Sequence, residues 1–281
     1  MPYLKHQGHR LAYTSYGEGP RTCVFVHGLL LSQKMHRVLA RELAERGNRV
    51  LTLDVLGHGR SDRPRDMTQY SMALFAEQIV GLLDHLEIEE AVIGGTSLGA
   101  NTALEAADLA PERVRGLIIE MPVLDNALLA CALVFTPLLV SLTLGEPVMR
   151  VVAALARRVP TAGGPALADL ALDTVRQDPG PSSAVLQGLF FGRIAPPKER
   201  RRLIEAPALV IGHDRDPVHP FSDADALLDE LPDARLLRAD SILELRLEPE
   251  RLTGEIAAFL DECWLPRSAD DAGTGRRRRV A

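Results

Sequence analysis

Short apolar runs alternate with stretches of helical spacing along most of the chain. Runs such as residues 21–26 (RTCVFV) and 114–120 (VRGLIIE) are almost continuously apolar, which is typical of strands covered on both faces. The other runs that predict strands are residues 11–16, 49–54, 90–94, 208–212 and 234–238. Helical spacing follows at residues 33–46, 71–86, 98–109 and 249–260. The alternation predicts an α/β fold with a mostly parallel, doubly wound sheet between layers of helices.

The pattern changes between residues 122 and 201, where only helical spacing and Pro/Gly breaks remain. A helical block that follows one strand of a sheet predicts an inserted cap. We therefore expect a core formed by residues 1–121 and 202–265, with a helical cap insertion at residues 122–201. Residues 266–281 are polar and contain four consecutive arginines, which predicts a disordered, Arg-rich tail.

One segment of the predicted cap is unusually apolar. Residues 127–144 (ALLACALVFTPLLVSLTL) carry no charge over a length that is marginal for crossing a membrane. The strands on either side must share one sheet, which excludes a single crossing, and Pro137 interrupts the segment. We expect no transmembrane span and interpret the segment as a pair of buried cap helices. A lid over an apolar substrate and the surface of a homodimer are the alternatives.

The composition limits the kinds of binding partner and the cellular compartment that we expect for the chain. The 281 residues are 46% hydrophobic and 25% charged, as in ordinary soluble domains, and the formal net charge of −6 argues against a nucleic-acid partner. Cys23, Cys131 and Cys263 form neither a paired motif nor a zinc set, so we predict no metal and no cofactor. No apolar run follows Met1, so no signal peptide is predicted and a cytoplasmic location is expected.

The strongest chemical signal is the pentapeptide Gly95-Thr96-Ser97-Leu98-Gly99. It lies between an apolar run and a predicted helix, which is the strand–turn–helix setting of a Gly-x-Ser-x-Gly nucleophile elbow. Glycines flank the serine because a Cβ at either position would crowd the strand or the helix. The motif predicts that Ser97 is a nucleophile, and a purely structural turn is the alternative.

Three further motifs follow predicted strands: His27-Gly28-Leu29-Leu30, residues 54–61 (DVLGHGRS) and residues 212–217 (GHDRDP). Together with the elbow they resemble the α/β-hydrolase fold superfamily, and the resemblance extends over about residues 11–260. It implies serine-esterase chemistry in which the backbone N–H groups of Leu29 and Leu98 form an oxyanion hole.

The resemblance also implies a triad acid after the late strand. Asp214 and Asp216 both fit this position, and Asp216 is preferred because Pro217 follows it, as in many members of the superfamily. His27 and His58 lie in motifs that are mainly structural in the superfamily, so we expect structural roles for them.

The superfamily's base histidine belongs in the loop after the last core strand, but residues 239–249 contain no histidine. Ser241 stands about where that histidine would be, and a hydroxyl cannot accept a proton near pH 7 as an imidazole can. His219, three residues after Asp216, is a possible substitute base. Further alternatives are His213, Asp240 and Glu244. The base is therefore left unassigned.

These observations predict a serine-type hydrolase that acts on a small, apolar ester or thioester through Ser97 and a backbone oxyanion hole. The expected partner is a small apolar substrate or ligand, and a homodimer through the cap is an open possibility. Two other functions fit the same scaffold, because a fold does not determine a function. One is a non-hydrolytic lyase or cyclase, and the other is a catalytically silent ligand-binding protein.

Overall fold

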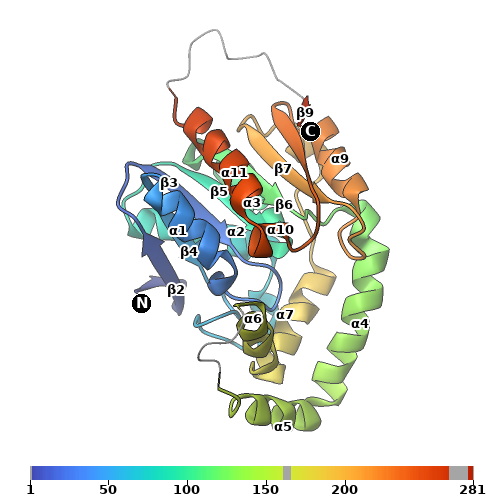
Figure 1. Cartoon of the computed structure of the whole chain (residues 1–281). Helices are drawn as coiled ribbons and strands as arrows, with labels where there is room; N and C mark the ends of the chain where they lie inside the picture. Colours follow the sequence, from blue (N-terminus) through green and yellow to red (C-terminus); the bar gives the residue numbers. More distant parts are fainter. Residues whose placement is uncertain (1, 161–165, 266–277, 281) are drawn as a thin grey trace.

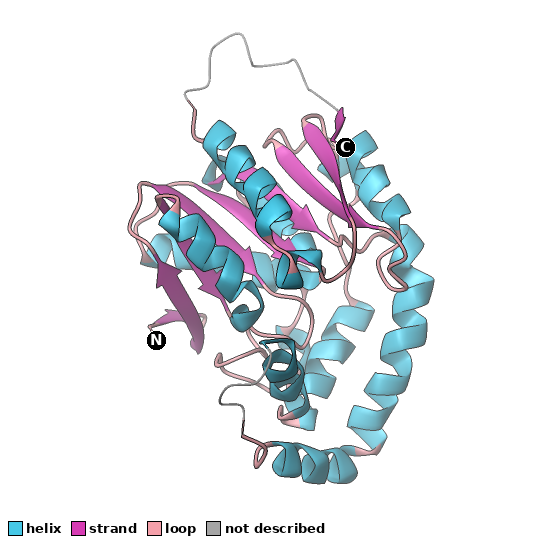
Figure 2. Ribbon diagram, in the orientation of Figure 1, coloured by secondary structure: helices cyan, strands magenta, loops and turns pink. Residues whose placement is uncertain are grey.

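A mostly parallel sheet forms the centre of the protein (Figures 1 and 2). A computed structural model of the chain describes residues 2–160, 166–265 and 278–280. The sheet has nine strands in the order β1-β2-β4-β3-β5-β6-β7-β8-β9. The β1–β2 and β2–β4 pairs are antiparallel, and the other neighbours run parallel. The strands are β1 (Tyr3–His6), β2 (His9–Tyr16), β3 (Arg21–Val26), β4 (Asn48–Leu53), β5 (Ala91–Thr96), β6 (Val114–Glu120), β7 (Ala208–His213), β8 (Ala234–Ala239) and β9 (Arg278–Val280).

Helices cover both faces of the sheet, as the apolar strands require. Val92 and Ile93 are neighbours on β5 but belong to different core clusters, because successive side chains of a strand point to opposite faces. Val92 packs in the cluster that contains Leu43 and Ile256, and Ile93 packs in the cluster that contains Ile79. The helices on the first face are α1 (Arg37–Glu45) and α11 (Glu250–Cys263). Those on the second face are α2 (Met72–His85), α3 (Leu98–Leu109) and α9 (Phe221–Glu230).

The predicted strands and helices of the core lie close to their predicted positions, with two differences. Residues 3–6 form the additional strand β1, which pairs with β2 across a turn where Gln7 and Gly8 have φ values of 47° and 85°. The helix predicted for residues 33–46 begins as a 3₁₀ turn instead. There the Gln33 N–H donates to Asp54 Oδ1 at 2.7 Å, which ties the turn to the end of β4.

The chain between β6 and β7 is helical and lies beyond the carboxyl ends of the strands (Figure 1). α4 runs along the outer edge of the protein to α5, at the opposite end of the molecule from β9. The Asn101 side chain on α3 joins both ends of this insertion, because its amide nitrogen donates to the carbonyls of Val123 and Ile194, each at 2.6 Å. The helices of this insertion, which lie where the sequence predicts a cap, are α4 (Leu128–Leu144), α5 (Glu146–Ala156), α6 (Ala166–Val175), α7 (Pro179–Phe191) and α8 (Lys198–Arg201).

The interpretation of residues 127–144 as a pair of buried helices is wrong. They form the single helix α4, with Pro137 inside it. Residues 125–144 are long and apolar enough to cross a membrane by length and composition, and only 11% of this stretch is buried inside the protein. Apolarity along a sequence does not specify what covers a helix, and here α5 and α7 pack against only part of α4.

The prediction of a disordered tail is wrong for residues 278–280. They form β9, which pairs in parallel with β8, and Arg279 forms an ion pair with Asp225 at 2.5 Å. The unpaired edge of β8 offers backbone N–H and C=O groups to any extended segment that reaches it, and composition alone does not reveal such an addition. The remainder of the predicted tail, residues 266–277 and 281, lies outside the described residues.

Candidate active site

Ser97 occupies the sharp turn between β5 and α3. Its backbone has φ 55° and ψ −110°, a conformation that a non-glycine residue adopts only where its surroundings hold it. The Ser97 N–H donates to the Glu120 carbonyl at 2.9 Å, which ties the turn to β6. A Cβ on Gly99 would lie 2.0 Å from the Val26 carbonyl oxygen, so only glycine lets α3 approach β3 this closely. The strand–turn–helix setting expected from the sequence is present.

His219 brings an imidazole to this serine. Its Nε2 lies 2.9 Å from Ser97 Oγ, and its Nδ1 lies 2.8 Å from Asp216 Oδ2. Asp216 and His219 belong to the loop between β7 and α9, at the same edge of the sheet as the β5–α3 turn. Asp216 Oδ1 also accepts the backbone N–H groups of Val218 at 2.8 Å and His219 at 3.0 Å. This tight turn brings the acid and the imidazole together.

These contacts determine where the imidazole carries its proton. An ionised carboxylate only accepts, so His219 Nδ1 donates to Asp216 and Nε2 offers its lone pair to the Ser97 hydroxyl. Burial would raise the pKa of Asp216, but hydrogen bonds from the His219 ring and from the His219 and Val218 N–H groups bring this pKa below its usual value. Asp216 is therefore ionised at neutral pH, and the arrangement can accept a proton from Ser97.

Leu29 and Leu98 lie beside Ser97 and line the same cavity. Leu98 is the first residue of α3, so its N–H is one of the unpaired donors at the positive end of the helix dipole. Leu29 follows β3 in a turn where the Leu31 N–H donates to the Gly28 carbonyl at 3.1 Å. The structure thus brings both residues of the predicted oxyanion hole to the serine.

The cavity beside Ser97 is small and apolar. Its volume is about 180 Å³, below the range of ~300–1,000 Å³ that is typical of sites for drug-sized ligands. Core residues of α2 and α3 form one wall, and cap residues of α4 and α7 form the other. The lining residues are Leu29, Met72, Ser97, Leu98, Asn101, Val123, Leu128, Cys131, Ala132, Phe135, Leu186, Leu189, Phe190, Gly192 and Ile194.

Known proteins share this architecture. A family model described as the alpha/beta hydrolase fold matches residues 22–139. The structure of the enol-lactonase from Burkholderia xenovorans LB400 superposes with a TM-score of 0.74 over 92% of this chain and 100% of that chain, at 23% identity. The meta-cleavage product hydrolase from Pseudomonas fluorescens IP01 superposes with a TM-score of 0.73 over 93% and 98% of the two chains, at 21% identity. The chain therefore has the α/β-hydrolase fold.

Several relatives by sequence are named as hydrolases. The 2-hydroxymuconate semialdehyde hydrolase of Pseudomonas sp. (strain CF600) is 45% identical over 83 residues, which are 30% of this chain and 29% of that protein. Bifunctional epoxide hydrolase 2 of Mus musculus is 36% identical over 110 residues, which are 39% of this chain and 20% of that protein. The matched part of the chain therefore spans less than a third of the length of either relative.

The chain departs from the expected superfamily pattern in the loop after β8. Ser241 is exposed, its hydroxyl accepts the Leu243 N–H at 3.3 Å, and its carbonyl accepts the Nδ1–H of His213 at 2.7 Å. Arg246, on the short helix α10 (Glu244–Leu247), is the side chain that reaches from this loop to the elbow. It donates to Thr96 Oγ1 at 2.9 Å, directly before the nucleophile position.

Arg246 also forms a buried ion pair with Glu120 at the end of β6. One guanidinium nitrogen lies 2.8 Å from Glu120 Oε2, and both side chains are almost fully buried. Burial would raise the pKa of Glu120, but the charge of Arg246 and hydrogen bonds from His213 and Arg246 hold it well below its usual range. The Glu120 backbone carbonyl accepts the Ser97 N–H, so the Arg246–Glu120 ion pair helps to hold the turn that carries Ser97.

Of the other carboxylates considered from the sequence, Asp214 and Glu244 have partners elsewhere and Asp240 is exposed. Asp214 forms an exposed ion pair with Arg238. Glu244 accepts the Asp240 N–H at 2.6 Å and forms an ion pair with Arg251 at 2.9 Å. Among the residues that the structure describes, the hydrogen-bond partner of Ser97 Oγ is His219.

His27 and His58 pack against each other in the interior, with ring centroids 4.8 Å apart. The Nδ1 atoms bind backbone carbonyls, Gly28 for His27 at 2.8 Å and Leu56 for His58 at 3.0 Å. Burial lowers the pKa of both imidazoles, so both are neutral at pH 7. These contacts fit the structural roles expected for the two histidines.

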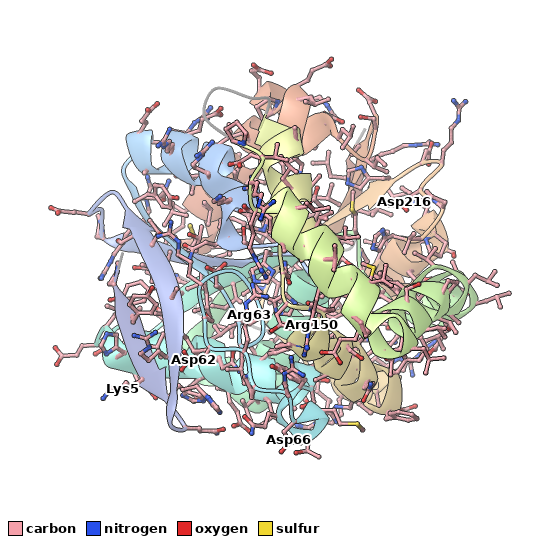
Figure 3. All side chains as sticks on the ribbon, turned by 90° about the horizontal axis from the view of Figure 1, so that it is seen from below. Lys5, Asp62, Arg63, Asp66, Arg150 and Asp216 are labelled. Carbon is pink, nitrogen blue, oxygen red and sulfur yellow. The ribbon has the colours of Figure 1, made fainter. Side chains whose placement is uncertain are left out.

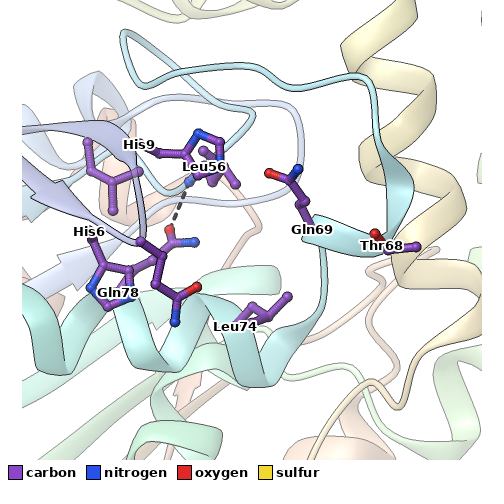
Figure 4. Close-up of a pocket in the computed structure, with 9 residues that line it drawn as sticks. His6, His9, Leu56, Thr68, Gln69, Leu74 and Gln78 are labelled. Carbon is purple, nitrogen blue, oxygen red and sulfur yellow. Dashed lines mark hydrogen bonds between the residues drawn. The ribbon is translucent and has the colours of Figure 1, made fainter.

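A second cavity, of about 310 Å³, lies between β1 and α2 (Figure 4). Polar side chains line much of it, including His6, Gln69 and Gln78. The Gln78 side-chain oxygen accepts the Leu56 N–H at 2.8 Å, which fixes the loop after β4. Ser97 does not line this cavity.

The contact that the sequence left open is the one between Ser97 and His219. The signal for it was local: an Asp-x-x-His spacing directly before Pro220, which precedes α9. A spacing of three residues allows a turn in which the His219 imidazole contacts the Asp216 carboxylate. The spacing does not reveal in which direction the imidazole points. Because His219 and Ser97 are far apart in the sequence, their contact depends on the tertiary structure.

Proposed function

We propose that this α/β-hydrolase is a serine hydrolase that cleaves a small, apolar carboxylic ester or thioester. Ser97 is the nucleophile, His219 the general base and Asp216 the acid that orients the base. The observation that carries the proposal is the 2.9 Å separation of His219 Nε2 from Ser97 Oγ, with Asp216 on the opposite ring nitrogen. A nucleophile, a base within hydrogen-bond reach and a third group that orients the base are what acyl transfer by a triad requires.

In the acylation step, Ser97 Oγ attacks the carbonyl carbon while His219 Nε2 takes the hydroxyl proton. The carbonyl oxygen becomes an anion, and the N–H groups of Leu29 and Leu98 stabilise it. The imidazolium of His219 is stabilised by Asp216. It then gives its proton to the departing alcohol or thiol, which leaves an acyl group on Ser97.

In the deacylation step, His219 removes a proton from a water molecule that attacks the acyl carbonyl. The same two backbone N–H groups stabilise the second tetrahedral anion, and His219 returns the proton to Ser97 Oγ as the carboxylic acid leaves. The Nδ1 proton stays on His219 throughout and is donated to Asp216, so the imidazole presents Nε2 to the reacting groups in both steps.

The substrate class follows from the cavity. Apart from Ser97 and Asn101, its side chains are apolar, so a charged or strongly hydrated group would lose its water without a partner there. The volume of about 180 Å³ suits a short acyl group better than a large one. A small aliphatic acyl chain fits both properties.

Labelling of Ser97 tests the proposal. A fluorophosphonate probe should modify the protein at a single serine, identified by peptide mass spectrometry, and Ser97→Ala should abolish both labelling and hydrolysis of p-nitrophenyl butyrate. Ser241→Ala is the matched control, because Ser241 is an exposed serine of the loop after β8, and it should leave labelling unchanged.

The other outcomes favour the remaining alternatives. A folded protein that binds an apolar fluorescent ligand but resists the probe is a silent ligand-binding protein. Turnover that survives Ser97→Ala indicates a lyase or cyclase that uses the cavity only to position its substrate.

A further inference from the structure

The cap exposes an extended apolar surface on two consecutive helices, α4 and α5. We call this surface the cap apolar face. Exposed large hydrophobic residues are common when scattered singly, but a continuous patch on consecutive helices marks an interaction site. Leu129, Leu133 and Leu144 on α4 are 72%, 68% and 81% exposed. The members of the face are Leu129, Leu133, Val134, Val140, Leu144, Val148, Val151 and Leu155.

Most of the exposed members of the face on α4 lie along one side of the helix. At the 100° per residue of an α-helix, Leu129, Leu133, Val140 and Leu144 fall within about 60° of one another, and Val134 projects about 140° away from Leu129. Such a side can lie in the acyl boundary of a bilayer while the opposite side of the helix faces the protein.

The charges of this part of the cap are opposite to those of the whole chain. Residues 128–160 contain three arginines and one glutamate, a net charge of +2, in a protein of net charge −6. Glu146 already binds Arg150 at 2.7 Å. Arg150 lies on α5, at the end of the molecule seen in Figure 3, and Arg157 and Arg158 directly follow that helix and are exposed. Arginines beside apolar side chains are suited to the headgroup layer of an anionic membrane.

The cavity beside Ser97 opens next to the cap apolar face. Leu128 and Phe190 line the cavity and are 47% and 43% exposed, so they form part of its mouth. Leu128 is also the first residue of α4.

We propose that the cap apolar face binds the surface of an anionic lipid bilayer, with α4 and α5 lying in the interface. The helices do not span the bilayer, because the chain enters the cap from β6 and returns to β7, and these strands are paired in one sheet. The arrangement is that of an interfacial helix pair, with apolar side chains in the acyl boundary and arginines at the headgroups. The proposal does not depend on the hydrolase activity.

Vesicle flotation tests the lipid proposal. The wild-type protein should float with vesicles of phosphatidylcholine containing about a third phosphatidylglycerol, and far less with pure phosphatidylcholine. Leu133→Asp combined with Leu144→Asp should reduce the floated fraction at least tenfold, since both side chains are exposed and neither lines the cavity. Leu203→Asp is the matched control, because Leu203 is 68% exposed outside the cap apolar face and should float like the wild type.

A further variant tests the electrostatic contribution to vesicle binding separately from the apolar one. Arg157→Glu combined with Arg158→Glu should abolish the preference for phosphatidylglycerol. Thermal unfolding of each variant should match the wild type, which shows that lost flotation is not lost folding.

Two results would overturn the proposal. One is a wild-type protein that stays in the soluble fraction with both kinds of vesicle. The other is a stable dimer in light scattering, about twice the 30.6 kDa of the chain, that Leu133→Asp and Leu144→Asp convert to a monomer while neither form floats. That result would assign the face to a second copy instead.

Discussion

Asp216 and His219 meet twice within one turn: through Oδ2 and the ring Nδ1 at 2.8 Å, and through Oδ1 and the backbone N–H at 3.0 Å. The second contact sets the backbone of the turn, and the first sets the orientation of the ring. A single loop after β7 therefore carries both the proposed acid, Asp216, and the proposed base, His219, whereas the superfamily pattern suggested two separate loops.

Replacement of the imidazole tests this arrangement directly. His219→Gln should lower kcat for p-nitrophenyl butyrate by ~10⁴- to 10⁶-fold with little change in KM, because the amide cannot take the Ser97 proton. Steady-state kinetics on freshly purified protein measure the effect, and His9→Gln serves as a control at a histidine outside the site. Activity within tenfold of the wild type would remove His219 from the role of base.

Asp216→Asn should leave the imidazole of His219 in place but move its proton from Nδ1 to Nε2. An amide that donates to Nδ1 puts the proton on Nε2, which then cannot accept from Ser97, and kcat should fall by ~10⁴-fold. Asp214→Asn is the matched control, since Asp214 pairs with Arg238 at the surface, and it should retain full activity. The assignment of the acid would be wrong if the two variants exchanged these results.

The buried Arg246–Glu120 pair predicts a large and pH-dependent contribution to stability. Arg246→Met leaves an unpaired buried carboxylate and should lower the free energy of unfolding by about 3–5 kcal/mol. Adding Glu120→Gln to Arg246→Met removes that charge and should restore most of the loss. Urea unfolding at pH 7 measures both, and equal stability of the single and double variants would contradict the pairing.

The sign of the pH effect follows from the lowered pKa of Glu120. The folded state binds its proton more weakly than the unfolded state, so the pair contributes fully above the unfolded carboxyl pKa of about 4.3. The contribution is lost as the pH falls from there toward the folded pKa. Wild-type unfolding free energy should therefore decline more steeply below pH 4.3 than that of the double variant.

The size of the cavity predicts the preferred acyl chain. Ala132 lines the cavity on α4, and Ala132→Leu should fill part of it. Hydrolysis of p-nitrophenyl hexanoate should then fall relative to p-nitrophenyl acetate by about 10-fold or more, since misfit of one or two methylenes costs ~1–3 kcal/mol. Ala154→Leu, at an exposed alanine of α5, is the control. An unchanged ratio of kcat/KM values would place the acyl group elsewhere.

The core of the fold could be predicted from the sequence because its signals are local. Continuous apolar runs identify buried parallel strands, and Gly95 and Gly99 identify a turn where strand, helix and backbone approach closely. The positions of β3, β6 and α3 agree with the predicted residues 21–26, 114–120 and 98–109. The positions of Ser97 and Leu98 at the end of a strand and the start of a helix therefore follow from local sequence signals alone, without knowledge of any tertiary contact.

The parts that the sequence did not predict depend on what lies next to a segment. The apolar residues of α4 indicated a buried position, but nothing within those residues says that its outer side has no protein cover. The three residues of β9 carry no strand signal in their own sequence, and they form a strand because they pair with the edge of β8. Likewise, the proximity of His219 to Ser97 follows from the positions of β5 and β7 on either side of β6.

The placement of Arg246 has a consequence for the end of the chain. In the proposed mechanism every reacting group lies between residues 29 and 219, so β8, α11 and β9 supply no atom that changes its bonds. The loop between β8 and α11 instead contributes the buried guanidinium of Arg246 on α10, which holds the turn that carries the nucleophile. Exposed positions in the last sixty or so residues are thus open to sequence drift without effect on the reaction, as long as that brace and the buried core residues of α11, such as Ile256, are retained.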